Sequence, residues 1–239
     1  MNKDNENKNE TVDDVFLDEN LNSHEIASRT LEPSLREKSN SMLQIADQYY
    51  IEGDLKTAFH WYLQAAKNGN IKAITQVGLM YYNGISTPVD YKKAFMWLNT
   101  GFAVFHRNAP VLYTLAEMYF YGRGVEQDYF KALNFYGMAY GNGRNINAAF
   151  RLAEIYEYGY GVEIDNQRAL DYYKDAANGG NVVAMNKLGL IYETGEIVEQ
   201  DYDKAKHWYS LAAQQGNAFA AAKLEQFPES DDGEKDNYE

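Results

Sequence analysis

The sequence has no cysteine, few prolines and little positive charge, and each of these shortages narrows the possible structures or partners of the protein. Without cysteine there can be no disulfide and no thiolate metal site. Only 4 of the 239 residues are proline, which suits a helical protein. No apolar run reaches about 18 residues, and the mean hydropathy is -0.58, so no transmembrane helix is expected. The chain has 22 Lys and Arg but 35 Asp and Glu, which gives a net charge of -13. This charge argues against electrostatic binding to DNA, RNA or anionic lipid.

Apolar residues are nevertheless abundant enough to form a core, because they make up 45% of the chain, and 15% of the chain is aromatic. The two ends differ from the rest. Residues 1–38 hold ten acidic and five basic residues, and residues 228–239 hold six acidic and one basic residue. Both segments are predicted to be acidic and largely disordered, since they bury too little apolar surface to offset the entropy of ordering. The first ten residues lack the apolar stretch of a secretory signal, and the expected location is cytoplasmic.

A two-part pattern occurs five times between these ends. The first part is an aliphatic residue, then Gly or Ala, then Tyr three residues later, and its copies begin at Ile45, Val77, Leu115, Leu152 and Leu188. The second part is an alanine followed three residues later by two large side chains, and its copies begin at Ala58, Ala94, Ala132, Ala169 and Ala205. The predicted repeats are residues 39–70, 71–110, 111–145, 146–181 and 182–217, and an Ala-rich capping helix is predicted over residues 218–227.

Each repeat is predicted to be a pair of helices. Apolar and small residues recur at i, i+1 and i+4 in the first part, and at i, i+3, i+4, i+7 and i+8 in the second, which is the period of amphipathic helices. A lone pair cannot bury both faces, so stacking must supply the stability, and small residues such as Gly189 are expected to let the neighbouring helix approach closely. The Gly-Asn pairs at 69–70, 180–181 and 216–217 indicate a helix end followed by an N-cap, and the predicted N-caps of second helices are Asp90, Asp128, Asp165 and Asp201.

The five repeated segments resemble the SEL-1-like repeat, which is a relative of the tetratricopeptide repeat. The fourth repeat carries the pattern nearly in full, with Leu152, Tyr156, Gly159, Gly161, Val162, Asp165, Arg168, Ala169, Tyr172, Tyr173, Ala176, Ala177 and Gly180. Repeats two and five depart from it, because Ser86 and Ile197 replace the second loop glycine. The resemblance implies a right-handed α-solenoid whose first helices line a concave surface. It also implies a role as an adaptor or scaffold for protein complexes, often in bacteria.

No motif in the sequence indicates catalysis. The four histidines lack the spacing of metal ligands and are predicted to be structural. The segment Gly122-Arg123-Gly124 lies between two predicted helices and lacks the rest of a phosphate-loop motif, so it is interpreted as a repeat loop. Glu154 and Glu157 are predicted to lie on a solvated helix face rather than to act as an acid–base pair. We therefore expect no enzymatic activity, no metal and no cofactor.

The predicted binding surface is the concave face of the first helices, at positions -2, +2, +5 and +6 from the start of each first part. Function is expected where equivalent positions differ between repeats. The candidate partner-binding residues are Tyr50, Leu79, Tyr82, Tyr113, Glu117, Phe120, Tyr121, Phe150, Glu154, Glu157, Tyr158, Leu190 and Glu193. These four positions carry aromatic residues and acids but no Lys or Arg, which predicts a basic peptide or protein partner with hydrophobic anchors, centred on repeats three and four.

Two functions stay open at this point. The first is a non-catalytic adaptor or scaffold that binds a protein partner in its concave groove. The alternative is a stoichiometric inhibitor, such as an immunity protein for a cognate, possibly basic nuclease toxin. For Tyr113 and Phe150, packing between repeats is an open alternative to partner binding, and the acidic ends are either solubilising or arms for a basic partner.

Overall fold

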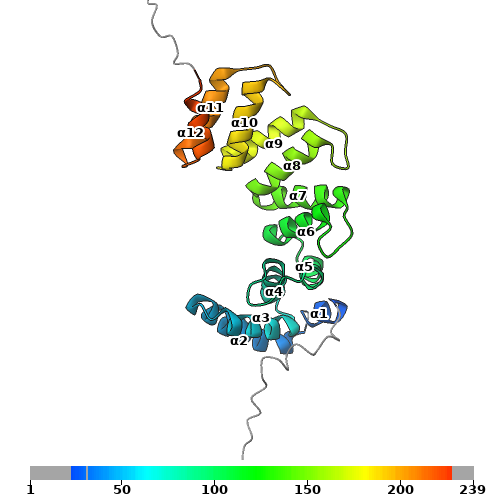
Figure 1. Cartoon of the computed structure of the whole chain (residues 1–239). Coiled ribbons are helices and arrows are strands. Elements are labelled where there is room, and N and C mark those ends of the chain that lie inside the picture. Colours follow the sequence, from blue (N-terminus) through cyan, green and yellow to red (C-terminus); the bar gives the residue numbers. More distant parts are fainter. Residues whose placement is uncertain (1–22, 31, 228–239) are drawn as a thin grey trace, which may run out of the picture. The chain divides into compact units, whose positions relative to one another are not determined.

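The computed structural model describes residues 23–30 and 32–227, and this part of the chain consists of α-helices joined by short loops (Figure 1). Its helices are α1 (Ser23–Arg29), α2 (Pro33–Glu52), α3 (Leu55–Lys67), α4 (Ile71–Asn83), α5 (Tyr91–Val104), α6 (Ala109–Tyr121), α7 (Tyr129–Gly143), α8 (Ile146–Tyr158), α9 (Asn166–Asn178), α10 (Val182–Thr194), α11 (Tyr202–Gln214) and α12 (Ala218–Leu224). The predicted all-α fold is confirmed, and α2 to α11 form one helix pair for each predicted repeat.

The chain divides into two compact units, residues 1–142 and residues 143–239. The first unit contains the pairs α2–α3, α4–α5 and, up to Asn142, α6–α7. The second contains α8–α9 and α10–α11, followed by α12. Within each unit the second helix of one pair packs on the first helix of the next, as α3 does on α4 and α9 on α10. Stacking of repeats therefore builds the core of each unit, as the sequence predicts.

Helices are present in a range that the sequence predicts to be largely disordered. Residues 23–29 form α1 and residues 33–38 form the start of α2, so the prediction of disorder over 1–38 is wrong for both ranges. Ile26 of α1 is fully buried, and the Nη1 of Arg29 donates a hydrogen bond to the carbonyl oxygen of Lys67 over 2.9 Å. A Cβ on Gly69 would lie 2.5 Å from the carbonyl carbon of Arg29, so only glycine lets α1 end against this turn. Residues 1–22 and 228–239, including the acidic tail, lie outside the described residues.

Side chains that the sequence singles out cap the helices. The predicted aspartate N-caps are confirmed: each accepts a hydrogen bond of 2.9 Å from the backbone N–H three residues later. The asparagines of the Gly-Asn pairs cap α4, α10 and α12 in the same way, and the preceding glycines have positive φ angles. Asn108 and Asn145, which the sequence analysis did not identify as caps, do the same for α6 and α8. Every first helix after α2 thus begins at an asparagine.

The loop within each of repeats two to five closes by the same three contacts. In repeat four, the backbone N–H of Asp165 donates to the carbonyl oxygen of Tyr156 over 2.9 Å. Arg168 pairs with the Asp165 carboxylate at 3.2 Å, and its guanidinium lies 5.3 Å from the centre of the Tyr156 ring. Equivalent residues make these contacts in the other three repeats. The cation–carboxylate pairs are solvent-exposed, so each adds little stability and mainly fixes the loop.

Alternating small and large residues pack the helix pairs, as predicted. A Cβ on Gly189 would lie 2.6 Å from the ring of Tyr209, which shows that the two helices approach too closely for any side chain there. The aliphatic residue that begins the first part is at most 2% exposed in repeats two to five. In repeat one its equivalent, Ile45, is 38% exposed, as is common at the terminal repeat of an array.

The C-terminal end of the array is covered by the predicted capping helix. α12 ends at Leu224, three residues earlier than predicted. The rings of Phe219 and Phe227 lie 6.3 and 6.1 Å from the ring of Tyr209, so both phenylalanines shield the last repeat. None of the helices built by residues 23–30 and 32–227 is long and apolar enough to cross a membrane.

Replacing Ser86 with glycine should stabilise the protein. Ser86 has a φ of 60° at the loop position that Gly124 and Gly161 occupy in repeats three and four, with φ of 73° and 70°. This left-handed conformation is unfavourable for serine and free of strain for glycine, so Ser86→Gly is expected to raise the free energy of unfolding by about 0.5–1 kcal/mol. Chemical denaturation measures the change. Ile197 occupies the equivalent position in repeat five without a positive φ, and Ile197→Gly should instead destabilise the protein. A gain from both substitutions would contradict the explanation.

Candidate functional site

The predicted binding residues differ in exposure. Tyr50, Tyr121 and Tyr158 are exposed at 39%, 41% and 52%. Glu117 is buried. The remaining candidates are half-buried, namely Leu79, Tyr82, Tyr113, Phe120, Phe150, Glu154, Glu157, Leu190 and Glu193. The prediction that the surface is centred on repeats three and four draws on residues of both units and stays a prediction.

A buried tyrosine of the second helix donates its hydroxyl to a carboxylate of the first helix in four repeats. The pairs are Tyr62 with Asp47 at 2.7 Å, Tyr136 with Glu117, Tyr173 with Glu157 at 2.6 Å, and Tyr209 with Glu193 at 2.7 Å. Burial raises the pKa of Tyr62, Tyr173 and Tyr209, and the hydrogen bond to the carboxylate raises it further. These hydroxyls therefore keep their protons and act as fixed internal donors.

Repeat two has neither the tyrosine nor the carboxylate of this pair. Leu98 replaces the tyrosine, and no acid lies at either of the positions that supply it elsewhere, because these are Leu79 and Tyr82. Leu98 is fully buried and Leu79 packs against the same core. Loss of both partners leaves no polar group unsatisfied, so the exchange for apolar side chains costs little. Leu79 is therefore in part a core residue.

Two of the same carboxylates also bind a lysine from the next element of the chain, which is repeat five for Glu157 and the capping helix α12 for Glu193. The Nζ of Lys187 lies 2.7 Å from a carboxylate oxygen of Glu157, and that of Lys223 lies 2.8 Å from one of Glu193. Both lysines stand one residue before a leucine, in equivalent positions of the pattern. They lie at position -1 of the pattern, outside the positions -2, +2, +5 and +6 of the predicted surface. The shared position was the signal that could have revealed them.

The acids of the predicted surface are therefore engaged within the chain. Glu154 pairs with Arg151 at 2.8 Å, and Asp47, Glu157 and Glu193 have the partners given above. Glu117 is only 8% exposed and accepts the hydroxyl of Tyr136, so its side chain belongs to the core rather than to a binding surface. These contacts leave the acids less capacity to pair with a basic partner than their abundance in the sequence suggests.

Arg123, in the loop between α6 and α7, organises aromatic residues of repeats two and three. Its Nη1 donates a hydrogen bond to the hydroxyl of Tyr82 over 3.0 Å. Its guanidinium lies 4.7 Å from the ring centre of Tyr121 and 5.5 Å from that of Tyr91. Such stacking holds an aromatic ring in one orientation while leaving part of it exposed. We call Tyr82, Tyr91, Tyr121 and Arg123 the Arg123 cluster.

The other aromatic candidates lie partly inside their own repeats. The ring of Tyr113 is 5.7 Å from that of Tyr136, and the ring of Phe150 is 5.6 Å from that of Tyr173. Phe120 contacts the rings of three neighbouring tyrosines. These half-buried rings pack against buried tyrosines of their own repeats instead of projecting alone. Tyr50, Tyr121 and Tyr158 are thus the candidates most available to a partner.

Helix pairs stacked on shared core positions define a helical-repeat protein. Within residues 23–30 and 32–227, no three His, Asp or Glu side chains lie where they could hold a metal ion. The family model of the Sel1 repeat matches residues 42–70, 71–100, 109–143, 146–181 and 182–217. The chain belongs to the Sel1 repeat family, whose members are generally scaffolds for interactions between proteins rather than enzymes.

Solved structures and a curated relative agree with this assignment. A Sel1 repeat protein from Oxalobacter formigenes is 30% identical over 81% of this chain and 80% of that chain, with a TM-score of 0.68. A protective antigen of uropathogenic Escherichia coli that displays an SLR fold is 26% identical over 79% of this chain and 41% of that one, with a TM-score of 0.70. An uncharacterised Sel1-like repeat-containing protein of Schizosaccharomyces pombe is 38% identical over 80 residues. The matched segment spans only 11% of that relative and 32% of this chain.

Removing the charge of Glu193 should destabilise the protein in a pH-dependent way. Burial works against the charge, but hydrogen bonds from Lys223 and Tyr209 outweigh burial and hold the pKa of Glu193 below its ordinary value of 4.5. Its ionised form therefore stabilises the fold above pH 4.5, and this contribution disappears as the pH falls through the lowered pKa. Glu193→Gln should cost about 1 kcal/mol at pH 7, and the difference from wild type should vanish in strong acid.

Urea denaturation at pH 7 and in strong acid measures the difference in the free energy of unfolding between Glu193→Gln and wild type. Glu196→Gln is the matched control, because Glu196 is exposed in the next loop and makes no interaction with another described residue. It should leave stability unchanged at both pH values. An equal cost for Glu193→Gln at neutral and acidic pH would show that side-chain shape, rather than charge, matters at this position.

Proposed function

We propose that this chain is a non-catalytic module that binds a protein or peptide partner through the first-helix faces of its repeats. The observation that supports it best is the exposed aromatic ring near the C-terminal end of three first helices. These are Tyr50 in α2, Tyr121 in α6 and Tyr158 in α8. A large aromatic side chain buries much area for little loss of conformational entropy, which makes it an effective interface anchor.

Two of these rings are already held in place. The guanidinium of Arg123 stacks on Tyr121, and the ammonium of Lys187 donates a hydrogen bond of 3.2 Å to the hydroxyl of Tyr158. A ring fixed before binding loses less freedom when a partner covers it, so more of its burial contributes to affinity. This preorganisation supports a binding role for Tyr121 and Tyr158 over that of incidental surface aromatics.

The proposed partner is attracted by charge but held mainly by apolar contact. The net charge of -13 favours the approach of a basic protein, and this part of the sequence prediction stays in the proposal. The carboxylates of the first-helix faces already pair with tyrosines, lysines and an arginine of the chain. They therefore have less to give a partner than free carboxylates would, and the aromatic anchors should dominate the binding energy.

The inhibitor alternative rests on the same surface and gains no separate support from the described residues. A basic nuclease toxin would need acidic side chains free to replace its nucleic-acid contacts. The pairing of Glu154, Glu157 and Glu193 within the chain makes an adaptor role the better-supported proposal.

Truncation of the exposed rings should release the partner. In an affinity pull-down from the native cell, quantified by mass spectrometry, Tyr121→Ala and Tyr158→Ala should each lower recovery of the specific partner by about tenfold, the effect of losing an interface anchor. Phe130→Ala is the matched control. Phe130 is an aromatic residue that is 63% exposed, but it lies at the start of α7, which is a second helix, and so outside the proposed first-helix surface. It should leave recovery unchanged.

Thermal unfolding of each variant checks that the fold is retained. If Phe130→Ala reduced recovery as much as Tyr121→Ala and Tyr158→Ala did, or if none of the three had an effect, the assignment to the first-helix face would be wrong. A product released from a substrate panel by the purified chain would overturn the non-catalytic part of the proposal.

A further inference from the structure

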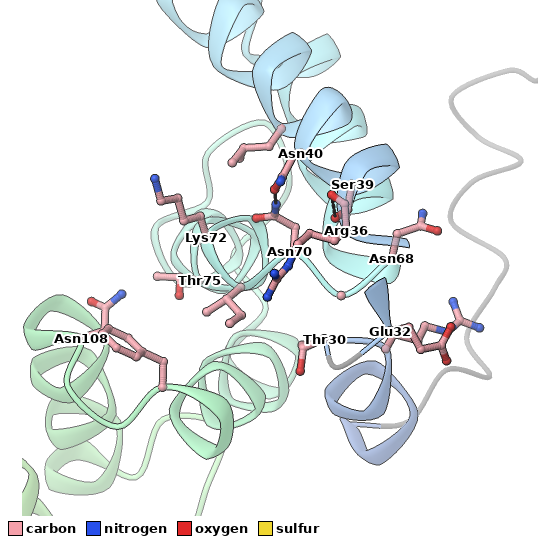
Figure 2. A pocket seen from close by; sticks show the side chains of 15 residues that line it. Thr30, Glu32, Arg36, Ser39, Asn40, Asn68, Asn70, Lys72, Thr75 and Asn108 are labelled. Atoms are coloured by element: carbon pink, nitrogen blue, oxygen red, sulfur yellow. Dashed lines mark hydrogen bonds between the residues drawn. The ribbon is translucent and has the colours of Figure 1, made fainter. Parts of the chain in front are cut away.

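A pocket of about 490 Å³ lies in the first unit, away from the Arg123 cluster. Its walls come from the end of α1, from Thr30 and Glu32, from the first half of α2, from the turn between α3 and α4, from the first half of α4, and from the loop between α5 and α6. Figure 2 shows Arg36, Asn70, Lys72 and Thr75 around the same opening. The volume lies within the range of sites that hold small ligands or short segments of a protein.

The charge of this pocket is opposite to that of the protein. Arg29, Arg36 and Lys72 line it together with one acid, Glu32, which gives the lining a net charge of +2. The whole chain carries -13. A concentration of cations in a concave site attracts anions locally, whatever the charge of the rest of the surface.

The two exposed cations have no partner within the described part of the chain. Arg36 and Lys72 are exposed, and neither the guanidinium of Arg36 nor the ammonium of Lys72 forms a hydrogen bond or an ion pair with another described residue. Arg29 differs, because its guanidinium donates to the carbonyl oxygen of Lys67 and holds α1 in place. Arg36 and Lys72 are therefore available for a ligand, whereas Arg29 has a structural role.

The polar groups between these cations are donors. The amide nitrogen of Asn70 donates to the Oδ1 of Asn40 over 2.9 Å, which leaves the amide nitrogen of Asn40 without an acceptor among the described residues. The Oδ1 of Asn108 accepts from the backbone N–H of Val111 over 3.3 Å, and its amide nitrogen is likewise left over. Unpaired donors beside cations favour a ligand rich in acceptors.

Thr75 adds a further hydroxyl that is available to a ligand of the pocket. Its side chain lines the pocket, and the residue is only 8% exposed. Its hydroxyl makes no hydrogen bond to a described residue, whereas the hydroxyls of Thr100 and Thr114 bind the backbone carbonyl four residues earlier. The hydroxyl oxygen is not among the fully buried, unpartnered side-chain atoms of the described residues, so it is accessible from the pocket and free to bind a ligand. An acceptor entering the pocket would satisfy it.

Apolar side chains complete the lining. Leu43, Ile71 and Phe105 face the pocket, and Phe105 is 50% exposed. A bare inorganic anion would gain nothing from them, but a peptide segment that carries both carboxylates and an apolar side chain would use both kinds of wall. We propose that this pocket binds a short acidic segment of a partner protein, with its carboxylates on Arg36 and Lys72 and its apolar side chain against Phe105.

This site is separate from the proposed aromatic surface. It uses none of Tyr50, Tyr121 and Tyr158 and requires a ligand of the opposite charge from the basic partner considered above. The two proposals can therefore fail independently. A chain with both sites would hold a basic and an acidic partner at the same time, as a scaffold protein does.

Binding of a defined probe to the full chain tests the pocket. The probe is a fluorescein-labelled, end-capped peptide that alternates Glu and Leu, followed by fluorescence anisotropy. Arg36→Glu and Lys72→Glu should each weaken its binding by about tenfold, because each loses a charge-assisted contact and adds repulsion. Thr75→Val should weaken binding by about fivefold, through loss of one hydrogen bond to the ligand.

Lys56→Glu is the matched control, since Lys56 is exposed on α3, lies outside the pocket lining and undergoes the same change of charge. It should leave affinity unchanged, and circular dichroism should show all variants folded. Binding that Lys56→Glu weakens as much as Lys72→Glu, or that Thr75→Val leaves intact, would mean diffuse attraction and no pocket. The proposal would also be overturned if a peptide with Gln in place of Glu bound equally well. The same holds if inorganic phosphate displaced the probe at the concentration at which unlabelled peptide does.

Discussion

The hydrogen bond between a buried tyrosine of the second helix and a carboxylate of the first is the contact on which the polar interior of four repeats depends. A tyrosine at this position, such as Tyr173, brings a hydroxyl into the core, and a carboxylate such as Glu157 is there to accept it. Neither group would be stable there without the other, because an unpaired polar group in an apolar surrounding is costly. Repeat two confirms the logic by lacking both, with Leu98 and Leu79 in their place.

The same carboxylates also link successive repeats within the second unit. Lys187 binds Glu157 of the repeat before it, and Lys223 of the capping helix binds Glu193. One acid thus satisfies the hydroxyl of its own repeat and the cation of the next. In the first unit Arg123 has a comparable role, since it reaches from repeat three to Tyr82 of repeat two. Repeats two, four and five are therefore each completed by a side chain from the next element of the chain, as expected of a repeat array.

This internal use of charge decides which groups remain for a partner. The acids of the first-helix faces serve the fold, so exposed aromatic rings such as Tyr121 and Tyr158 are the better candidates for binding. Two cations whose side chains have no partner among the described residues, Arg36 and Lys72, line the pocket beside α1. The described part of this acidic chain thus contains a basic concavity, and our two proposals assign different partners to the two surfaces.

The number of repeats, the helix pairs, the capping aspartates and the tight contact at Gly189 follow from the sequence alone, because periodic spacing and capping are local properties of the chain. Only the tertiary structure showed that Glu117 is buried, that Lys187 reaches Glu157, and that Ile26 anchors a helix in a segment predicted to be disordered. These contacts join residues distant in sequence, and composition or spacing within one helix does not encode the side chain that arrives from another.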